Sequence, residues 1–130
     1  MKGFVSKMLV TVAVLFAGFN TASAQSDFYT NIDLDGQTVT GRTIYKYDGY
    51  LTPHLKYDYT YDNQRRMSSR TAYLWLDVMN EWVPYYRIDY SYTDGMVNMK
   101  YGVWDKRTND FDKFKEEGSY EATGNNHPQW

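Results

Sequence analysis

The sequence predicts an all-β protein: an antiparallel meander of about seven strands built from repeated hairpins, forming a curved sheet or half-open barrel after an N-terminal signal helix. Three observations support this fold class. Apolar and polar residues alternate along most of the chain after residue 24, turn residues separate the alternating segments, and no segment there has apolar residues at helical spacing over three turns. With 130 residues, the chain is expected to form a single domain.

The N-terminus predicts a secretory signal peptide. Lys2 and Lys7 flank a short basic region, an apolar stretch follows from Met8 to Phe19, and Ala22-Ser23-Ala24 provides small residues for cleavage. The apolar stretch is shorter than the roughly 18 residues that are needed to span a bilayer. We therefore expect cleavage after Ala24 and no membrane span in the mature protein.

The chain is expected to divide into three parts. Residues 1–24 form the signal peptide, residues 25–122 form the β-meander domain, and residues 123–130 form a flexible C-terminal tail. The mature protein is expected in the periplasm, at the outer-membrane surface or outside the cell. Because Lys2 and Lys7 are removed with the signal peptide, the net charge becomes more negative than the −2 of the full chain. This charge argues against a nucleic-acid partner, which requires a positive surface.

Turn residues mark the ends of the expected strands. Asp35-Gly36 and Asp94-Gly95 are typical of tight hairpins, because both residue types tolerate the positive φ that such turns require. Asp62-Asn63-Gln64-Arg65 supplies a further turn, the segment 77–81 separates two strands, and the segment 105–110 is interpreted as a polar loop. The expected strands, in order, are 28–34, 37–47, 55–61, 66–76, 82–92, 96–104 and 111–122.

Strict alternation within these segments predicts which side chains share a face. From Leu55 onward, Leu55, Tyr57, Tyr59 and Tyr61 alternate with Lys56, Asp58 and Thr60. Similar alternation brings tyrosines and tryptophans together in the next two segments. We therefore expect one common aromatic face, whose candidate ligand-binding side chains are Tyr57, Tyr59, Tyr73, Trp75, Trp82, Tyr86 and Tyr90.

Aromatic residues also reveal an internal repeat. Trp75 and Trp82 are seven positions apart, and Trp104 and Phe111 show the same spacing 29 positions later. This pattern predicts a repeated unit of roughly 30 residues, each a hairpin with its connection. In each unit the two aromatic side chains are expected to face each other across the strand ends and to close the loop.

Two resemblances to known sequence families follow from these motifs. The segment Tyr61-Asp62-Asn63-Gln64-Arg65-Arg66-Met67 resembles the Y-D-x-x-G-R-L core of the YD repeat, with Arg65 at the position of the glycine. A longer part of the chain, about Ile44 to Ala122, resembles a family of small exported Bacteroidetes proteins known as domain of unknown function 3836. The features that carry this second resemblance are Tyr59-Thr60-Tyr61-Asp62, Tyr73-Leu74-Trp75, Glu81-Trp82-Val83-Pro84-Tyr85-Tyr86 and the Trp104 to Phe111 loop. The resemblance implies a sheet of β-hairpins in the bacterial envelope or outside the cell, and it implies no known activity or catalytic residue.

The composition leaves the role of the aromatic face open. The chain has 14 Tyr, 4 Trp and 6 Phe, and no helix is available to cover one face of the sheet. Tyrosine suits a partly wet surface, because its ring packs while its hydroxyl keeps a hydrogen bond. These residues therefore form either a partly solvated aromatic platform or the ordinary core of a small barrel.

Candidate catalytic and metal-binding groups are few. The chain has no Cys, and its two histidines, His54 and His127, are interpreted as surface residues. The calcium-loop-like start at Asn31 lacks the required acidic residue, because Arg42 occupies the twelfth position. We expect no catalytic residue, no metal site and no cofactor. Arg70 and Arg87 are expected to form cross-strand ion pairs with Asp58 and Asp89.

These observations favour a non-catalytic protein that binds a glycan or a peptide through its aromatic face. The alternative is a structural or self-associating envelope protein, in which edge strands or aromatic rings meet a second copy in a homo-oligomer. A small hydrolase that uses the acidic loops is a third interpretation. For the acidic residues, interleaving with lysine and arginine favours a solvated surface over a catalytic pair.

Overall fold

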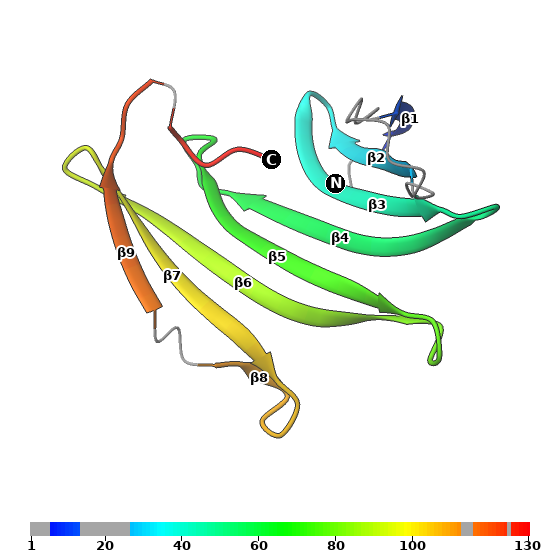
Figure 1. The fold of residues 1–130 in the computed structure, drawn as a ribbon. Coiled ribbons are helices and arrows are strands. Elements are labelled where there is room, and N and C mark those ends of the chain that lie inside the picture. The colour runs from blue at the N-terminus through cyan, green and yellow to red at the C-terminus, as the bar shows by residue number, and fades with distance from the viewer. Residues whose placement is uncertain (1–5, 14–26, 113–115, 125) are drawn as a thin grey trace, which may run out of the picture.

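The computed structural model describes residues 6–13, 27–112, 116–124 and 126–130, which form one curved antiparallel sheet (Figure 1). The strand order is β1-β2-β3-β4-β5-β6-β7-β8, and β9 also pairs with β7. This confirms the expected all-β meander. The strands are β1 (Ser6–Ala13), β2 (Asp27–Asp35), β3 (Thr38–Tyr47), β4 (Leu51–Tyr61), β5 (Met67–Leu76), β6 (Glu81–Thr93), β7 (Met96–Asp105), β8 (Asp110–Phe111) and β9 (Glu116–Glu121).

The first and last expected elements differ from the structure. Within the expected signal helix, residues 6–13 form the strand β1, which pairs with β2 from Ser6↔Leu34 to Ala13↔Tyr29. The β-branched residues of this stretch suit a strand, and β2 offers it an edge. The proposed cleavage site lies outside the described residues. Among those residues, the structure contains no helical segment with the length and hydropathy to cross a membrane.

The expected strand 111–122 is divided into two. β8 pairs with Trp104 and Asp105 at the end of β7, whereas β9 pairs with Met96 to Tyr101 at its start. Both short strands therefore lie along the same side of β7. Apart from β9, which pairs with β7, each described strand is hydrogen-bonded to the strand that precedes or follows it in the chain. The two edges of the sheet do not pair with each other, so the described strands do not close into a barrel.

The hairpin turns have the backbone geometry that their residues predict. Asp94 and Gly95 both have positive φ, at 52° and 74°, as a two-residue turn between twisted strands requires. Gly36 has a φ of 62°. Arg65, which occupies the glycine position of the YD pattern, has a φ of 61°. The resemblance thus identifies a real conformational requirement in the β4–β5 turn.

The two faces of the sheet differ in burial. We call the face that carries Tyr57 and Tyr59 the inner face, because the buried core lies on it, and the opposite face the outer face. The core lies on the inner face, where Val39, Tyr59 and Met67 contact one another and are buried. The Tyr61 hydroxyl donates to the Val39 carbonyl at 2.5 Å. The core is small because a single layer curls over itself rather than packing against a second layer.

Candidate functional site

The predicted aromatic residues lie on opposite faces of the sheet. In the β4–β5 register, Tyr57 pairs with Ala72 and Lys56 pairs with Tyr73. Because paired residues share a face and successive residues alternate, Tyr73 lies opposite Tyr57. The prediction of one common face is therefore wrong. The inner face carries Tyr57, Tyr59, Tyr86 and Tyr90, and the outer face carries Tyr73, Trp75 and Trp82.

A β-bulge explains why β6 contributes to both groups. Ala72 pairs with Tyr86, but the next residue, Tyr73, pairs with Pro84, so Tyr85 is an extra residue in β6. A bulge of this kind reverses the faces of the side chains that follow it. Trp82 and Tyr86 therefore lie on opposite faces although an even number of positions separates them.

On the outer face, the aromatic side chains contact each other and a lysine. The Trp75 and Trp82 ring centroids are 5.3 Å apart with an interplanar angle of 69°. The Lys56 Nζ lies 4.7 Å from the centroid of Tyr73 and 5.2 Å from that of Trp82. These contacts close the end of the β5–β6 hairpin and cover the ring faces. The outer cluster is thus accounted for by hairpin stability.

On the inner face, two arginines lie over a pair of parallel tyrosine rings. The Tyr57 and Tyr59 centroids are 6.3 Å apart with an interplanar angle of 11°. The Arg70 guanidinium carbon lies 5.9 Å from the Tyr57 centroid and 5.6 Å from the Tyr59 centroid. The Arg42 guanidinium carbon lies 5.2 Å from the Tyr57 centroid. Neighbouring strands β3, β4 and β5 thus bring two cations and two aromatic rings together.

Within the described part of the chain, the two inner-face arginines take part in no ion pair. The expected pair between Arg70 and Asp58 is wrong, because Asp58 pairs with Thr71 in the register and lies on the outer face. Arg87 does bond Asp89, at 2.8 Å, although both belong to β6. Among the described residues, no carboxylate lies within ion-pair distance of Arg42 or Arg70.

Several polar atoms of this cluster are buried without a hydrogen-bond partner. They are the Nε atoms of Arg42 and Arg70 and the hydroxyl of Tyr59, whose side chain is only 4% exposed. Buried polar groups in folded proteins are nearly always paired, and each unpaired group is costly. Three such atoms lie in this cluster, which makes it the candidate binding site. We call Arg42, Arg70, Tyr57 and Tyr59 the arginine–tyrosine site.

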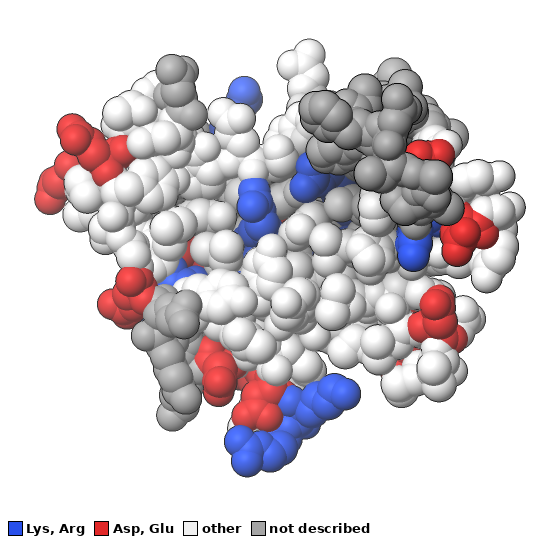
Figure 2. Space-filling view, in the orientation of Figure 1, with Lys and Arg blue, Asp and Glu red and all other residues white. Residues whose placement is uncertain are grey.

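The surrounding tyrosines remain neutral at ordinary pH. Burial raises the pKa of Tyr59, while Arg42 and Arg70 act in the opposite direction. Burial also raises the pKa of Tyr86 to about 12 and that of Tyr90 above its usual range. The charge of the arginine–tyrosine site is therefore positive. In Figure 2, some Lys and Arg side chains lie in the hollow at the upper middle of the molecule and others at its lower edge, whereas most Asp and Glu side chains lie toward its outline.

The C-terminal segment lies against this face. The Arg70 guanidinium donates a hydrogen bond to the backbone carbonyl of Gln129. The His127 ring stacks on Tyr92 with centroids 6.5 Å apart. Trp130 lines a cavity of about 240 Å³ together with Val39 and other residues near the β2–β3 turn. The tail that the sequence predicts to be flexible thus contacts β6 through His127, β5 through Gln129 and the end of β4 through Trp130. In Figure 1 the red segment ends close to the β4–β5 turn.

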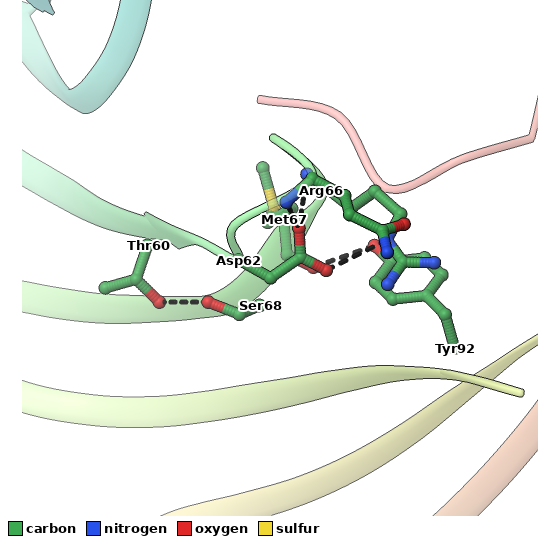
Figure 3. Close-up of polar contacts among 7 residues, drawn as sticks. Thr60, Asp62, Arg66, Met67, Ser68 and Tyr92 are labelled. Atoms are coloured by element: carbon green, nitrogen blue, oxygen red, sulfur yellow. Dashed lines mark hydrogen bonds and ion pairs between the residues drawn. The ribbon is translucent and has the colours of Figure 1, made fainter.

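The β4–β5 turn, next to the C-terminal tail, is held by several hydrogen bonds. The Asp62 carboxylate accepts hydrogen bonds from the backbone of Gln64 and from the backbone and Nε of Arg66, all at 2.9 Å (Figure 3). The Arg66 guanidinium carbon lies 4.2 Å from the Tyr92 centroid, and the Tyr92 hydroxyl donates to the Met67 carbonyl at 2.7 Å. These contacts join the β4–β5 turn to β6.

Sequence reasoning did not identify Arg42 and Arg70 as site residues. The position of Arg70 in the sequence could have indicated it. Arg70 lies on the same face of β5 as Ala72 and Leu74, where an inward-facing residue is usually apolar. The described residues hold no cluster of three or more His, Cys, Asp or Glu side chains suited to a metal ion.

Comparison with known proteins places the chain in a family. Residues 1–121 match the model of a family of unknown function, DUF3836. No curated protein matches the chain.

Three solved structures share the fold. A DUF3836 protein from Parabacteroides distasonis is 24% identical, with a TM-score of 0.67 over 75% of this chain and 92% of that chain. A DUF3836 protein from Bacteroides vulgatus is 22% identical, with a TM-score of 0.69 over 72% and 98%. A protein of unknown function from Bacteroides fragilis is 26% identical, with a TM-score of 0.67 over 78% and 76%. Together with the match to residues 1–121, these similarities show that the chain belongs to the DUF3836 family.

Proposed function

We propose that this protein is an exported, non-catalytic binding module whose inner face holds an extended peptide. The observation that carries the proposal is the arginine–tyrosine site, where Arg42 and Arg70 lie over tyrosine rings and no described acidic residue pairs with them. A peptide offers carbonyl and carboxylate groups at the spacing of a strand, and these groups accept hydrogen bonds from guanidinium donors.

The arrangement of the rings favours a peptide over a glycan. Sugar rings stack on flat aromatic faces that are open to solvent, whereas here guanidinium groups lie over Tyr57 and Tyr59. On the outer face, Lys56 lies over Trp82, and Trp75 meets Trp82 edge to face. A backbone carbonyl, by contrast, already bonds Arg70.

The test measures binding of the purified protein to an array of synthetic peptides and, in parallel, to a glycan array. We expect peptide spots to be bound and the signal to fall at least tenfold in Arg70→Gln. The matched control is Lys56→Gln, which removes a cation from over an aromatic ring on the outer face and is expected to keep the signal. Binding to glycans only, with loss in Lys56→Gln and not in Arg70→Gln, would contradict the proposal.

Export is part of the proposal and is supported by the N-terminal sequence pattern. The test is expression in a Gram-negative host, followed by cell fractionation and N-terminal sequencing. We expect the protein outside the cytoplasm with Gln25 as its first residue. Recovery of the intact chain in the cytoplasm contradicts export and leaves peptide binding to be judged by the array.

Self-association is a second candidate, favoured by apolar side chains at two neighbouring hairpin turns. Tyr50 and Leu51 are 70% and 57% exposed beside the β3–β4 turn, and Val78 and Met79 are 99% and 60% exposed in the β5–β6 turn. Both turns lie at the right of Figure 1. Exposed apolar side chains that lie close together often mark a protein contact. Sedimentation would show a dimer that Val78→Ser with Met79→Ser converts to a monomer, whereas a monomeric parent protein excludes this candidate.

A further inference from the structure

We infer that residues 127–130 are an internal occupant of the arginine–tyrosine site, and that the external ligand is a peptide bearing a carboxylate, which displaces them. This inference rests on the proposed function. The inference specifies that the ligand is negatively charged and that it competes with the protein's own C-terminal residues. We call residues 127–130 the docked segment.

The docked segment shows how peptide groups fit this face. It makes three kinds of contact. The backbone carbonyl of Gln129 accepts from the Arg70 guanidinium, the His127 imidazole stacks on the Tyr92 ring, and Trp130 forms part of the wall of the cavity near the β2–β3 turn. These contacts follow one another across β6, β5 and β4, so the segment crosses the strands rather than extending the sheet at an edge.

The docked segment can leave without disturbing the turn before it. That turn is held by Asn126, whose side-chain amide donates to the Glu121 carbonyl at 2.7 Å and accepts from the Thr123 backbone at 2.5 Å. Neither bond involves residues 127–130. Gln129 is exposed, and Trp130 is 50% exposed, so the docked segment covers the inner face with only part of its surface.

The docked segment leaves the site only partly satisfied. With Gln129 in place, the Nε atoms of Arg42 and Arg70 and the Tyr59 hydroxyl still lack partners. A neutral carbonyl accepts from one guanidinium nitrogen at this site, whereas a carboxylate has two oxygens and matches the fork of donors that arginine presents. A carboxylate also neutralises charge that no acidic residue among those described balances. An acidic peptide therefore has an advantage that the docked segment lacks.

The test compares the full chain with a chain that ends at Asn126, using two fluorescent hexapeptides. One is the sequence of residues 125–130, Asn-Asn-His-Pro-Gln-Trp with an amidated C-terminus, and the other has Glu in place of Gln. We expect the shortened chain to bind the Gln peptide at least tenfold more tightly than the full chain, because the tethered segment no longer competes. The Glu peptide is expected to bind several-fold more tightly than the Gln peptide, with the difference shrinking at high salt.

Variants separate the possible outcomes. In the shortened chain, Arg70→Gln is expected to remove the preference for the Glu peptide, whereas Lys56→Gln keeps it. His127→Ala with Trp130→Ala in a full-length chain provides a second way to release the segment, and unfolding midpoints confirm that each protein is folded. Equal affinity of the full and released chains overturns the competition. Equal affinity for the two peptides overturns the requirement for a carboxylate. If neither hexapeptide binds while array peptides do, the inference fails and the proposed function stands; if no peptide binds at all, both fail.

Discussion

Trp75 and Trp82 meet edge to face across the open end of the β5–β6 hairpin, with centroids 5.3 Å apart and an interplanar angle of 69°. Trp104 and Phe111 repeat this contact between β7 and β8, at 5.1 Å and 71°. The backbone repeats as well, because Asn80 and its counterpart in the next loop, Asn109, both have a φ of 54°. The internal repeat predicted from spacing is thus confirmed in both ring geometry and turn conformation.

We expect Trp82→Ala to lower the free energy of unfolding by about 2 to 3 kcal/mol. The substitution removes an aromatic pair, a cation–π contact with Lys56 and part of the buried area of a large ring. Urea denaturation followed by circular dichroism measures the loss. Phe111→Ala, at the two-residue strand β8, is the comparison and is expected to cost less. A loss below about 0.5 kcal/mol for Trp82→Ala contradicts a stabilising role for the pair.

We expect Arg65→Gly to stabilise the protein by about 0.5 to 1 kcal/mol. Arg65 adopts a φ of 61°, which strains a side chain with a Cβ and suits glycine. Gly36→Ala is the reverse experiment. Gly36 has a φ of 62° and open space around an added Cβ, so only backbone strain opposes the substitution. We expect it to lower the free energy of unfolding by about 1 kcal/mol. Equal unfolding midpoints for Arg65→Gly and the parent protein show that the turn carries no such strain.

From the hydrogen bonds of Asp62, we expect the stability of the protein to decrease at low pH. The backbone hydrogen bond from Arg66, followed by the Arg66 side chain and the Gln64 backbone, lowers the pKa of Asp62 below its ordinary value of 3.8. A lowered pKa in the folded state means that the stabilisation is complete above that ordinary value and is lost as the pH falls through the folded one. Thermal unfolding of the parent and Asp62→Asn should therefore differ most at pH 7 and converge at low pH. Asp48→Asn, in the exposed β3–β4 turn, serves as the control for the general effect of removing one carboxylate.

Buried tyrosines predict a loss of stability in alkali. Burial raises the pKa of Tyr92 to about 12 from its ordinary value of 10.0. Because the folded value is the higher one, this stabilisation is complete below pH 10.0 and decreases as the pH rises to about 12. Urea denaturation between these pH values measures the slope, which Tyr92→Phe should reduce. The same variant should cost about 1 kcal/mol at pH 7, since it removes the hydrogen bond to Met67. An unchanged slope contradicts the assignment to Tyr92.

Alternation and turn residues predicted most strands, because both depend only on residues that are close in the sequence. Alternation from Leu55 to Tyr61 identified the second half of β4, and Asp94-Gly95 identified a turn whose two φ values are positive. The positive φ at Arg65 was likewise visible in the match to the YD pattern. These features depend on residues a few positions apart, which the sequence displays directly.

Which face each side chain occupies depends on the pairing register between strands, which the sequence does not show directly. Tyr73 and Tyr57 face opposite ways only because Lys56, and not Tyr57, is the register partner of Tyr73. The extra residue Tyr85 then reverses Trp82 relative to Tyr86. A single-residue change in register exchanges all faces of a strand, so alternation alone leaves two answers. The partner of Arg70 was missed for a similar reason, since Gln129 lies 59 positions away in the chain.

The nearest-neighbour order of the strands has a consequence for how the chain reaches its native state. Almost every strand finds its partner within one hairpin, so the sheet grows by successive closure of short loops, each with a small entropic cost. The bond between Arg70 and Gln129 closes a far longer loop and has no surface to form on until β5 and β6 are in place. The C-terminal residues therefore settle last, and the inner face forms before its own tail covers it.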